Sequence, residues 1–114
     1  DMMLRYVADE EHNVNDSRNW GNYLDSTGDA ATNSGSSNMN YTTGRNEAWK
    51  AKNIYDIAGN MREWTMEAFF TNVRVFRGGY YHNYGFDSPA SRRDGNFPYF
   101  SDYDNLSFRP ALIL

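Results

Sequence analysis

The segment AGNMREWTM, residues 58–66, constrains the fold more than any other part of the sequence. Gly59 and Asn60 suit a tight turn, because these residue types tolerate backbone angles that others rarely adopt. The residues that follow alternate with the two-residue period of a β-strand, with Met61, Glu63 and Thr65 on one face and Arg62, Trp64 and Met66 on the other. We expect Trp64 to anchor the core. Glu63 needs a cationic partner, since an unpaired carboxylate within a strand is costly.

Residues 1–12, DMMLRYVADEEH, have the pattern of the end of a helix. Met3, Tyr6 and Val7 fall on one helical face and are expected to be the buried ones. Because the chain starts without an initiator methionine and with what reads as the end of a helix, we expect it to be the C-terminal portion of something longer.

Residues 21–44 contain mainly Gly, Ser, Asn and Thr, with little to bury. This composition predicts a long polar surface loop. Short strands are predicted at 73–77 and 108–114, where apolar residues gather between turn-forming ones. The sequence therefore indicates an α+β domain with short strands and much irregular loop.

Composition excludes several classes of function. The chain of 114 residues has a net charge of −4 and no basic cluster larger than the pair Arg92 and Arg93, which argues against a nucleic-acid partner. No apolar run is long enough to predict insertion into a membrane. The absence of cysteine excludes thiol nucleophiles, disulfides and thiolate metal sites.

Three segments together resemble a known family. The segments are KNIYDIAGNMREWTMEA at 52–68, RVFRGG at 74–79 and FRPALIL at 108–114. In order and spacing they are similar to the hallmark motifs of the formylglycine-generating-enzyme family, which has a C-type-lectin-like fold. The resemblance covers about the last 65 residues and implies that residues 1–114 are the C-terminal part of one such domain. The chain departs from the family pattern at Ile54, Met61 and Arg62, where Gly, Val and Trp are usual.

The chemistry of that family is not expected here. Its oxidation reaction uses two cysteines that follow the R-G-G motif, and this chain has none. A related branch uses a histidine-based iron site, whereas His12 and His82 lack the usual ligand spacing and are expected to be exposed polar residues. Asp87 and Asp94, with Asp102 and Asp104, are interpreted as turn formers and not as hydrolytic carboxylates. We therefore predict no enzyme activity, with an enzymatic or degenerate family member as the alternative.

The resemblance also bears on Glu63. In the family, the matching glutamate helps to hold a structural calcium ion together with nearby backbone carbonyls. The alternative is a salt bridge to an arginine such as Arg77 or Arg109, and we expect both arginines to brace carbonyls or carboxylates. No cofactor is required by the sequence, and a structural Ca²⁺ at Glu63 is left open.

The last third of the chain has an unusual composition. Residues 77–114 contain no Trp, Met, Gln, Lys or Glu, although residues 1–76 contain three Trp, five Met, two Lys and five Glu. Randomising the two adenines of the asparagine codons AAC and AAT yields codons that cannot encode those five residues. The same codons do encode Tyr, Phe, His, Asp, Asn, Ser, Gly and Arg, which fill most of this segment.

This pattern resembles the variable region of the target proteins of diversity-generating retroelements, a group that includes the major tropism determinant of a bacteriophage. Such a region diversifies the surface of a C-type-lectin-like domain, and Tyr with small polar residues is typical of adaptable binding loops. The resemblance implies a variable ligand-binding region at 77–109. Its expected display positions are Tyr80, His82, Asn83, Tyr84, Phe86, Asp87, Arg92, Asp94, Asn96, Phe97, Tyr99, Phe100, Asp102, Tyr103 and Asp104.

Two aromatic residues beside the scaffold motifs, Tyr81 and Phe108, are expected in the core instead. The expected partner is a protein or glycan ligand on a cell surface, and the chain itself is expected on a virion or a cell surface. A homo-oligomer and a purely structural role in a phage particle stay open as alternatives.

Overall fold

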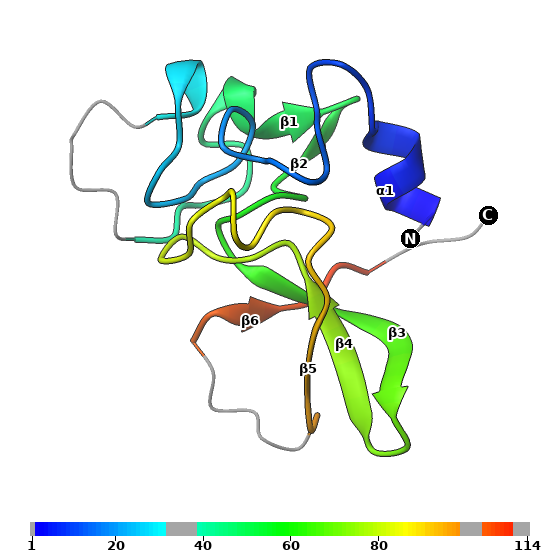
Figure 1. The fold of residues 1–114 in the computed structure, drawn as a ribbon. Coiled ribbons are helices and arrows are strands. Elements are labelled where there is room, and N and C mark those ends of the chain that lie inside the picture. The colour runs from blue at the N-terminus through cyan, green and yellow to red at the C-terminus, as the bar shows by residue number, and fades with distance from the viewer. Residues whose placement is uncertain (1, 32–38, 99–103, 111–114) are drawn as a thin grey trace.

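The computed structural model describes residues 2–31, 39–98 and 104–110 (Figure 1). The helix α1 spans Met2–Val7, and two short 3₁₀ helices span Gly28–Ala30 and Glu47–Trp49. The strands are β1 Lys50–Ala51, β2 Ile54–Tyr55, β3 Arg62–Phe70, β4 Val73–Arg77, β5 Asp94–Asn96 and β6 Leu106–Ser107. The described chain is thus a mixed α and β structure in which loop predominates.

The strands form two sheets. β1 and β2 make a small antiparallel pair, and the larger sheet has the order β5-β4-β3-β6. β4 pairs antiparallel with both β3 and β5, whereas β6 runs parallel to β3. Register shifts within the β3–β4 pairing accompany the curl of the sheet, as irregularities of this kind increase strand twist. Figure 1 shows the β3–β4 hairpin extending away from the loop-rich part of the molecule.

The core lies in the loop-rich part, between α1, β1 and the loops that join them. Trp20, Tyr23 and Val7 are almost completely buried there, together with Ile57, Ala58 and Ala90. Trp49 is also buried, and its indole Nε1 donates a hydrogen bond to the Ala30 carbonyl at 2.8 Å. Trp20 satisfies its indole in the same way, on the Asn13 carbonyl at 3.0 Å. Each buried indole therefore has the partner that its N–H needs.

Several elements agree with the sequence-based expectations. Gly59 and Asn60 both have positive φ angles, 68° and 63°, as the predicted turn requires. The predicted strand after this turn is present and is longer than expected, and the predicted strand 73–77 coincides with β4.

The predicted strand at 108–114 is wrong in its described part. β6 ends at Ser107, residues 108–110 are not a strand, and residues 111–114 lie outside the described residues. The buried face of the helix also differs from the predicted one: Leu4 and Val7 are buried, whereas Met3 and Tyr6 are exposed.

Two predictions about burial need correction. Residues 21–44 were expected to form a surface loop with little to bury, yet Gly21, Asn22 and Tyr23 lie in the core. Trp64 was expected to anchor the core, but it is only half-buried and contacts Phe76 edge-on, with ring centres 5.6 Å apart. The physical reason is that the core cluster lies among α1, β1 and their loops, whereas Trp64 lies on β3 and packs against its neighbour in the sheet.

Candidate ligand-binding surface

Three glycine-containing segments meet where β4 ends. The Gly59 N–H donates to the Gly78 carbonyl at 2.7 Å, and the Asn60 N–H donates to the Asn22 carbonyl at 3.0 Å. The Tyr23 hydroxyl also donates to the Gly78 carbonyl, at 2.6 Å. These contacts join the turn before β3, the turn after β4 and the buried start of the predicted loop into one unit, which we call the frame.

Tyr23 is the centre of the frame. A Cβ atom added at Gly21 would lie 2.5 Å from the Tyr23 ring, and one at Gly85 would lie 2.8 Å from it. At Gly79 an added Cβ would lie 2.4 Å from the Ser88 carbonyl oxygen and 3.0 Å from the Tyr23 ring. The glycines therefore let the backbone approach a buried ring from three directions. Burial raises the pKa of the Tyr23 hydroxyl, so Tyr23 stays neutral and donates.

The segment after the frame is held by side chains from an earlier loop. The carboxylate of Asp25 accepts the Gly85 N–H at 2.6 Å, and the hydroxyl of Ser17 accepts the Ala90 N–H at 2.9 Å. The Ser17 N–H in turn donates to the Gly85 carbonyl at 3.2 Å. Backbone groups of the predicted variable region are thus paired with residues 14–25, outside that region.

The predicted display positions separate into three groups. Those that are exposed are His82, Tyr84, Phe86, Asp87, Arg92, Asp94 and Asp104. Those that are half-buried are Tyr80, Asn83, Asn96 and Phe97. Tyr99, Phe100, Asp102 and Tyr103 lie outside the described residues.

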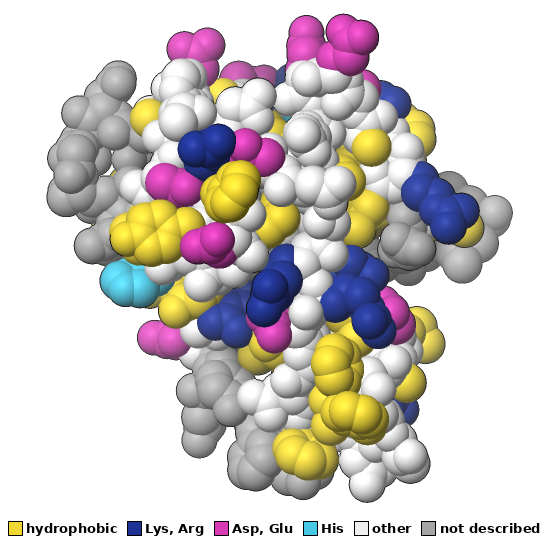
Figure 2. Space-filling view, viewed as in Figure 1, with side chains coloured by type: hydrophobic (Ala, Val, Ile, Leu, Met, Phe, Trp, Pro, Cys, Tyr) yellow, Lys and Arg dark blue, Asp and Glu magenta, His cyan; other side chains and the backbone are white. Residues whose placement is uncertain are grey.

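Buried residues alternate with these exposed ones along the same segment. They are Gly78, Gly79, Gly85, Pro89 and Ala90, all small or cyclic. Figure 2 shows hydrophobic, acidic and histidine side chains side by side over the loop that follows β4, and a second hydrophobic group over the lower sheet. The segment therefore presents large side chains outward from a backbone that is packed by small ones.

Asn83, one of the half-buried display positions, also makes local hydrogen bonds. Its side-chain oxygen accepts the Tyr80 N–H at 3.0 Å, and its carbonyl accepts the Leu24 N–H at 3.0 Å. Asn83 therefore shapes the loop through local hydrogen bonding, as asparagine commonly does in turns. A substitution here would alter the backbone as well as the surface.

Further aromatic and histidine predictions have mixed outcomes. Phe108 was expected in the core, but it is 78% exposed, because β6 has ended and the chain has left the sheet. Tyr81 is half-buried and packs against Tyr80. His82 is exposed as predicted, whereas His12 is not: its ring contacts Asp9 and the Lys50 carbonyl and lies edge-on to Trp20.

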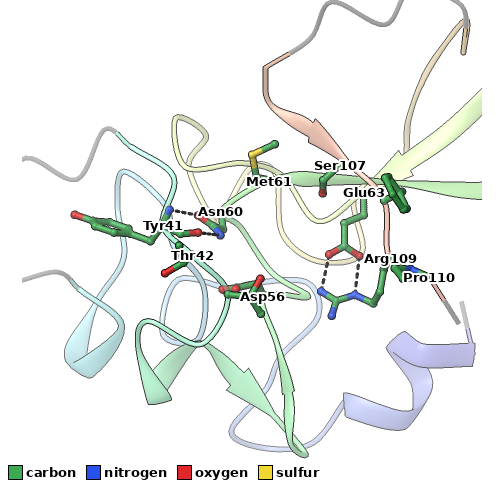
Figure 3. Close-up of a pocket in the computed structure, with 11 residues that line it drawn as sticks. Tyr41, Thr42, Asp56, Asn60, Met61, Glu63, Ser107, Arg109 and Pro110 are labelled. Carbon is green, nitrogen blue, oxygen red and sulfur yellow. Dashed lines mark hydrogen bonds and ion pairs between the residues drawn. The ribbon is translucent and has the colours of Figure 1, made fainter. Parts of the chain in front are cut away.

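A separate pocket of about 370 Å³ lies between the turn before β3 and the chain after β6 (Figure 3). Glu63 and Arg109 lie together in its lining as a two-pronged ion pair, with Nη2 to Oε1 at 2.5 Å and Nε to Oε2 at 3.0 Å. Arg109 also donates to the Tyr55 carbonyl at 2.9 Å. The structure thus shows the salt-bridge alternative for Glu63 and the predicted bracing role for Arg109.

Arg77, on the neighbouring strand β4, has the same kind of role. It donates to the Ser91 carbonyl at 2.6 Å and to Glu67 at 3.2 Å. The prediction that Arg77 braces a carbonyl and a carboxylate is therefore confirmed. Among the described residues no group of three or more His, Cys, Asp or Glu side chains is placed to hold a metal ion. The structural calcium at Glu63 stays a prediction, and an ion there would compete with Arg109.

Asp56 is the buried acidic group of this pocket. Burial raises its pKa to about 6, the charge of Arg109 opposes that rise, and the charge of Glu63 adds to it. Neither carboxylate oxygen has a hydrogen bond of ordinary geometry among the described residues, and the contacts toward Gly44 and Thr43 lower the pKa less than burial raises it. Asp56 is thus partly protonated near pH 6.

Sequence reasoning missed the residues that position the surface. Tyr23, Ser17 and Asp25 lie in polar stretches far from the recognised motifs, and their roles follow from long-range contacts. The one available signal was the group GNY at 21–23, a tyrosine two residues after a glycine within a segment otherwise poor in apolar residues.

Comparisons with protein-family models, with curated proteins and with solved structures find no match to this chain. In the described residues no helix has the length and apolar character needed to cross a bilayer.

Proposed function

We propose that the chain is a ligand-binding domain of the C-type-lectin-like type, related to the formylglycine-generating enzymes, and that residues 77–109 are its variable binding region. On this proposal the region is diversified by a retroelement and recognises a protein or glycan on a cell surface. The domain acts by binding, without a catalytic step of its own. It is presented on a virion or on a cell surface.

One observation carries the proposal. Along residues 78–94, exposed aromatic and charged side chains such as Tyr84 and Phe86 are interspersed with small buried residues such as Gly85 and Ala90. The backbone hydrogen bonds of Gly85 and Ala90 go to Asp25 and Ser17, which lie outside the variable region. A surface built in this way tolerates new side chains at its exposed positions, because the backbone does not depend on those side chains.

The composition of the segment supports the same reading. The exposed residues Tyr84, Phe86, His82 and Asp87 all belong to the set that adenine-directed change of AAC or AAT produces. Tyr and Arg are also the residues that most often dominate binding energy when they lie at the centre of an interface. The described surface therefore has the chemistry of a binding face.

The test is the DNA that encodes and flanks the segment. We expect a near-copy that carries AAC or AAT at the codons for Tyr84, Phe86, Asp87 and Arg92, close to a reverse transcriptase gene. Arg92 itself should be encoded by CGC or CGT, because these are the only arginine codons that end in C or T. A segment without such a copy, or an Arg92 codon ending in A or G, would contradict the proposal.

A further inference from the structure

The side chain of Arg62 is held in place without an anionic partner among the described residues. It is half-buried at the start of β3, with its guanidinium carbon 4.9 Å from the centre of the Phe76 ring and 4.4 Å from that of Tyr80. The guanidinium makes no hydrogen bond and no ion pair with any other described residue, and its Nε is buried and unsatisfied. The two ring contacts hold the guanidinium in place, and its N–H groups have no acceptor among the described residues.

The ring contacts decide how a ligand can approach. A guanidinium that stacks on aromatic rings has its faces covered, so its N–H bonds are reached from the edge, in the plane of the group. That edge presents parallel donors whose spacing matches the two oxygens of a carboxylate. The stacking also reduces the entropy that Arg62 loses when it binds, since the side chain is already ordered.

The surroundings favour a singly charged anion. Arg62 shares a shallow hollow with Arg77, Arg92 and Asp94. Arg77 is already paired with Glu67, and Arg92 has only a loose contact of 3.7 Å with Asp94. Arg62 and Arg92 therefore attract an anion in a chain of net charge −4, while Asp94 opposes a second negative charge.

We propose that Arg62 is a fixed anchor for a carboxylate group of the ligand. This inference rests on the proposed binding function and states the chemistry of one of its contacts. Arg62 belongs to the scaffold strand β3, whereas Tyr80 belongs to the predicted variable region. The site thus combines a constant charge with a ring that changes between variants, and the side chain at position 80 sets how firmly the guanidinium is held.

The test uses the full chain labelled with ¹⁵N and follows the Nε–Hε resonance of Arg62 during titration. The probes are sodium acetate, sodium sulfate and inorganic phosphate, at constant ionic strength. N-acetylglutamate amide and glucuronate then represent a carboxylate from a protein and one from a glycan. We expect a saturable shift with acetate and with both larger carboxylates, and the tighter of these two identifies the source of the group.

Variants separate the anchor from general charge effects. Arg62→Gln should lose the binding of carboxylates, detected by isothermal calorimetry with the tighter of the two larger probes. Arg62→Lys keeps the charge but loses the planar edge, and should bind at least tenfold more weakly. Tyr80→Ser removes one ring and should weaken binding several-fold. Arg74→Gln is the matched control, because Arg74 lies in the same sheet and, within the described part of the chain, donates to the Thr71 and Val73 carbonyls.

The inference is overturned if no carboxylate shifts the Arg62 resonance, if sulfate or phosphate binds more tightly than acetate, or if Arg62→Lys binds as well as the parent chain. Thermal melting of each variant shows whether it is folded, and Arg62→Lys keeps the test valid if Arg62→Gln unfolds. Any of these results leaves the DNA test of the binding function unaffected, so the two proposals fail separately.

Discussion

Tyr23 and Tyr84 show two opposite uses of the same residue type within one surface. Tyr23 is completely buried, touches three glycines and donates to the Gly78 carbonyl. Tyr84 is exposed, a short distance away along a segment that the frame supports. The difference shows that residue type alone does not tell whether a side chain in this region is buried or exposed. What decides the role of a side chain is whether the frame depends on it.

The strongest way to break this comparison is to remove Tyr23. Tyr23→Ala deletes a fully buried ring from between three close glycine backbones and should lower the free energy of unfolding by ~3–5 kcal/mol. Tyr23→Phe loses only the hydroxyl bond to Gly78 and should lower it by about 1 kcal/mol, because the Gly59 N–H still serves that carbonyl. Urea unfolding followed by tryptophan fluorescence measures both.

Tyr84→Ala is the matched control for this pair of variants. It removes the same ring from the exposed side and should change the free energy of unfolding by less than ~0.5 kcal/mol. Equal losses for Tyr23→Ala and Tyr84→Ala would show that the two tyrosines do not differ in the way described.

The sequence predicted the parts of the fold that rest on local rules. The turn at Gly59 and Asn60, the strand after it and β4 follow from backbone preference and alternation, and all three are present. The charge pair of Glu63 was one of two stated alternatives, because a carboxylate within a strand needs a partner.

The rest depends on contacts between distant residues. Nothing local distinguishes Tyr23 from an exposed tyrosine, or Trp20 as a core residue from Trp64 on the sheet. Phe108 fits a strand by composition, yet the strand ends before it. In the display segment, exposed and buried positions alternate because glycines pack on Tyr23 and because Ser17 and Asp25 accept backbone hydrogen bonds. No sequence periodicity predicts these contacts.

Asp56, in the pocket beside Arg109, provides a smaller and pH-dependent test of how burial sets the role of a side chain. Asp56 has a pKa of about 6 in the folded chain, above its ordinary value of 3.8. The folded state therefore binds this proton more tightly than the unfolded state, so Asp56 ionises at a cost to stability as the pH rises from 4 through 6. The free energy of unfolding of Asp56→Asn, relative to that of the parent chain, should therefore increase by roughly 2 kcal/mol between pH 4 and pH 7.

Urea unfolding at a series of pH values checks this prediction. Asp87→Asn is the control, because it removes one negative charge from an exposed position of the display segment. Asparagine is also well suited to the backbone of residue 56, whose φ is 59°. A stability difference that stays constant from pH 4 to pH 7 would contradict the burial of an ionisable Asp56.

The smallest expected effect belongs to the display side chains themselves, and its measurement tests the central claim most directly. The claim is that the frame holds the display segment whatever side chains its exposed positions carry. Hydrogen exchange of the Gly85 and Ala90 amides reports on the braces from Asp25 and Ser17. In a triple variant, His82→Ser with Tyr84→Ser and Phe86→Ser, both amides should keep the protection of the parent chain. Gly85→Ala, which places a Cβ 2.8 Å from the Tyr23 ring, should reduce it. Loss of protection in the triple variant, with full protection in Gly85→Ala, would contradict the account.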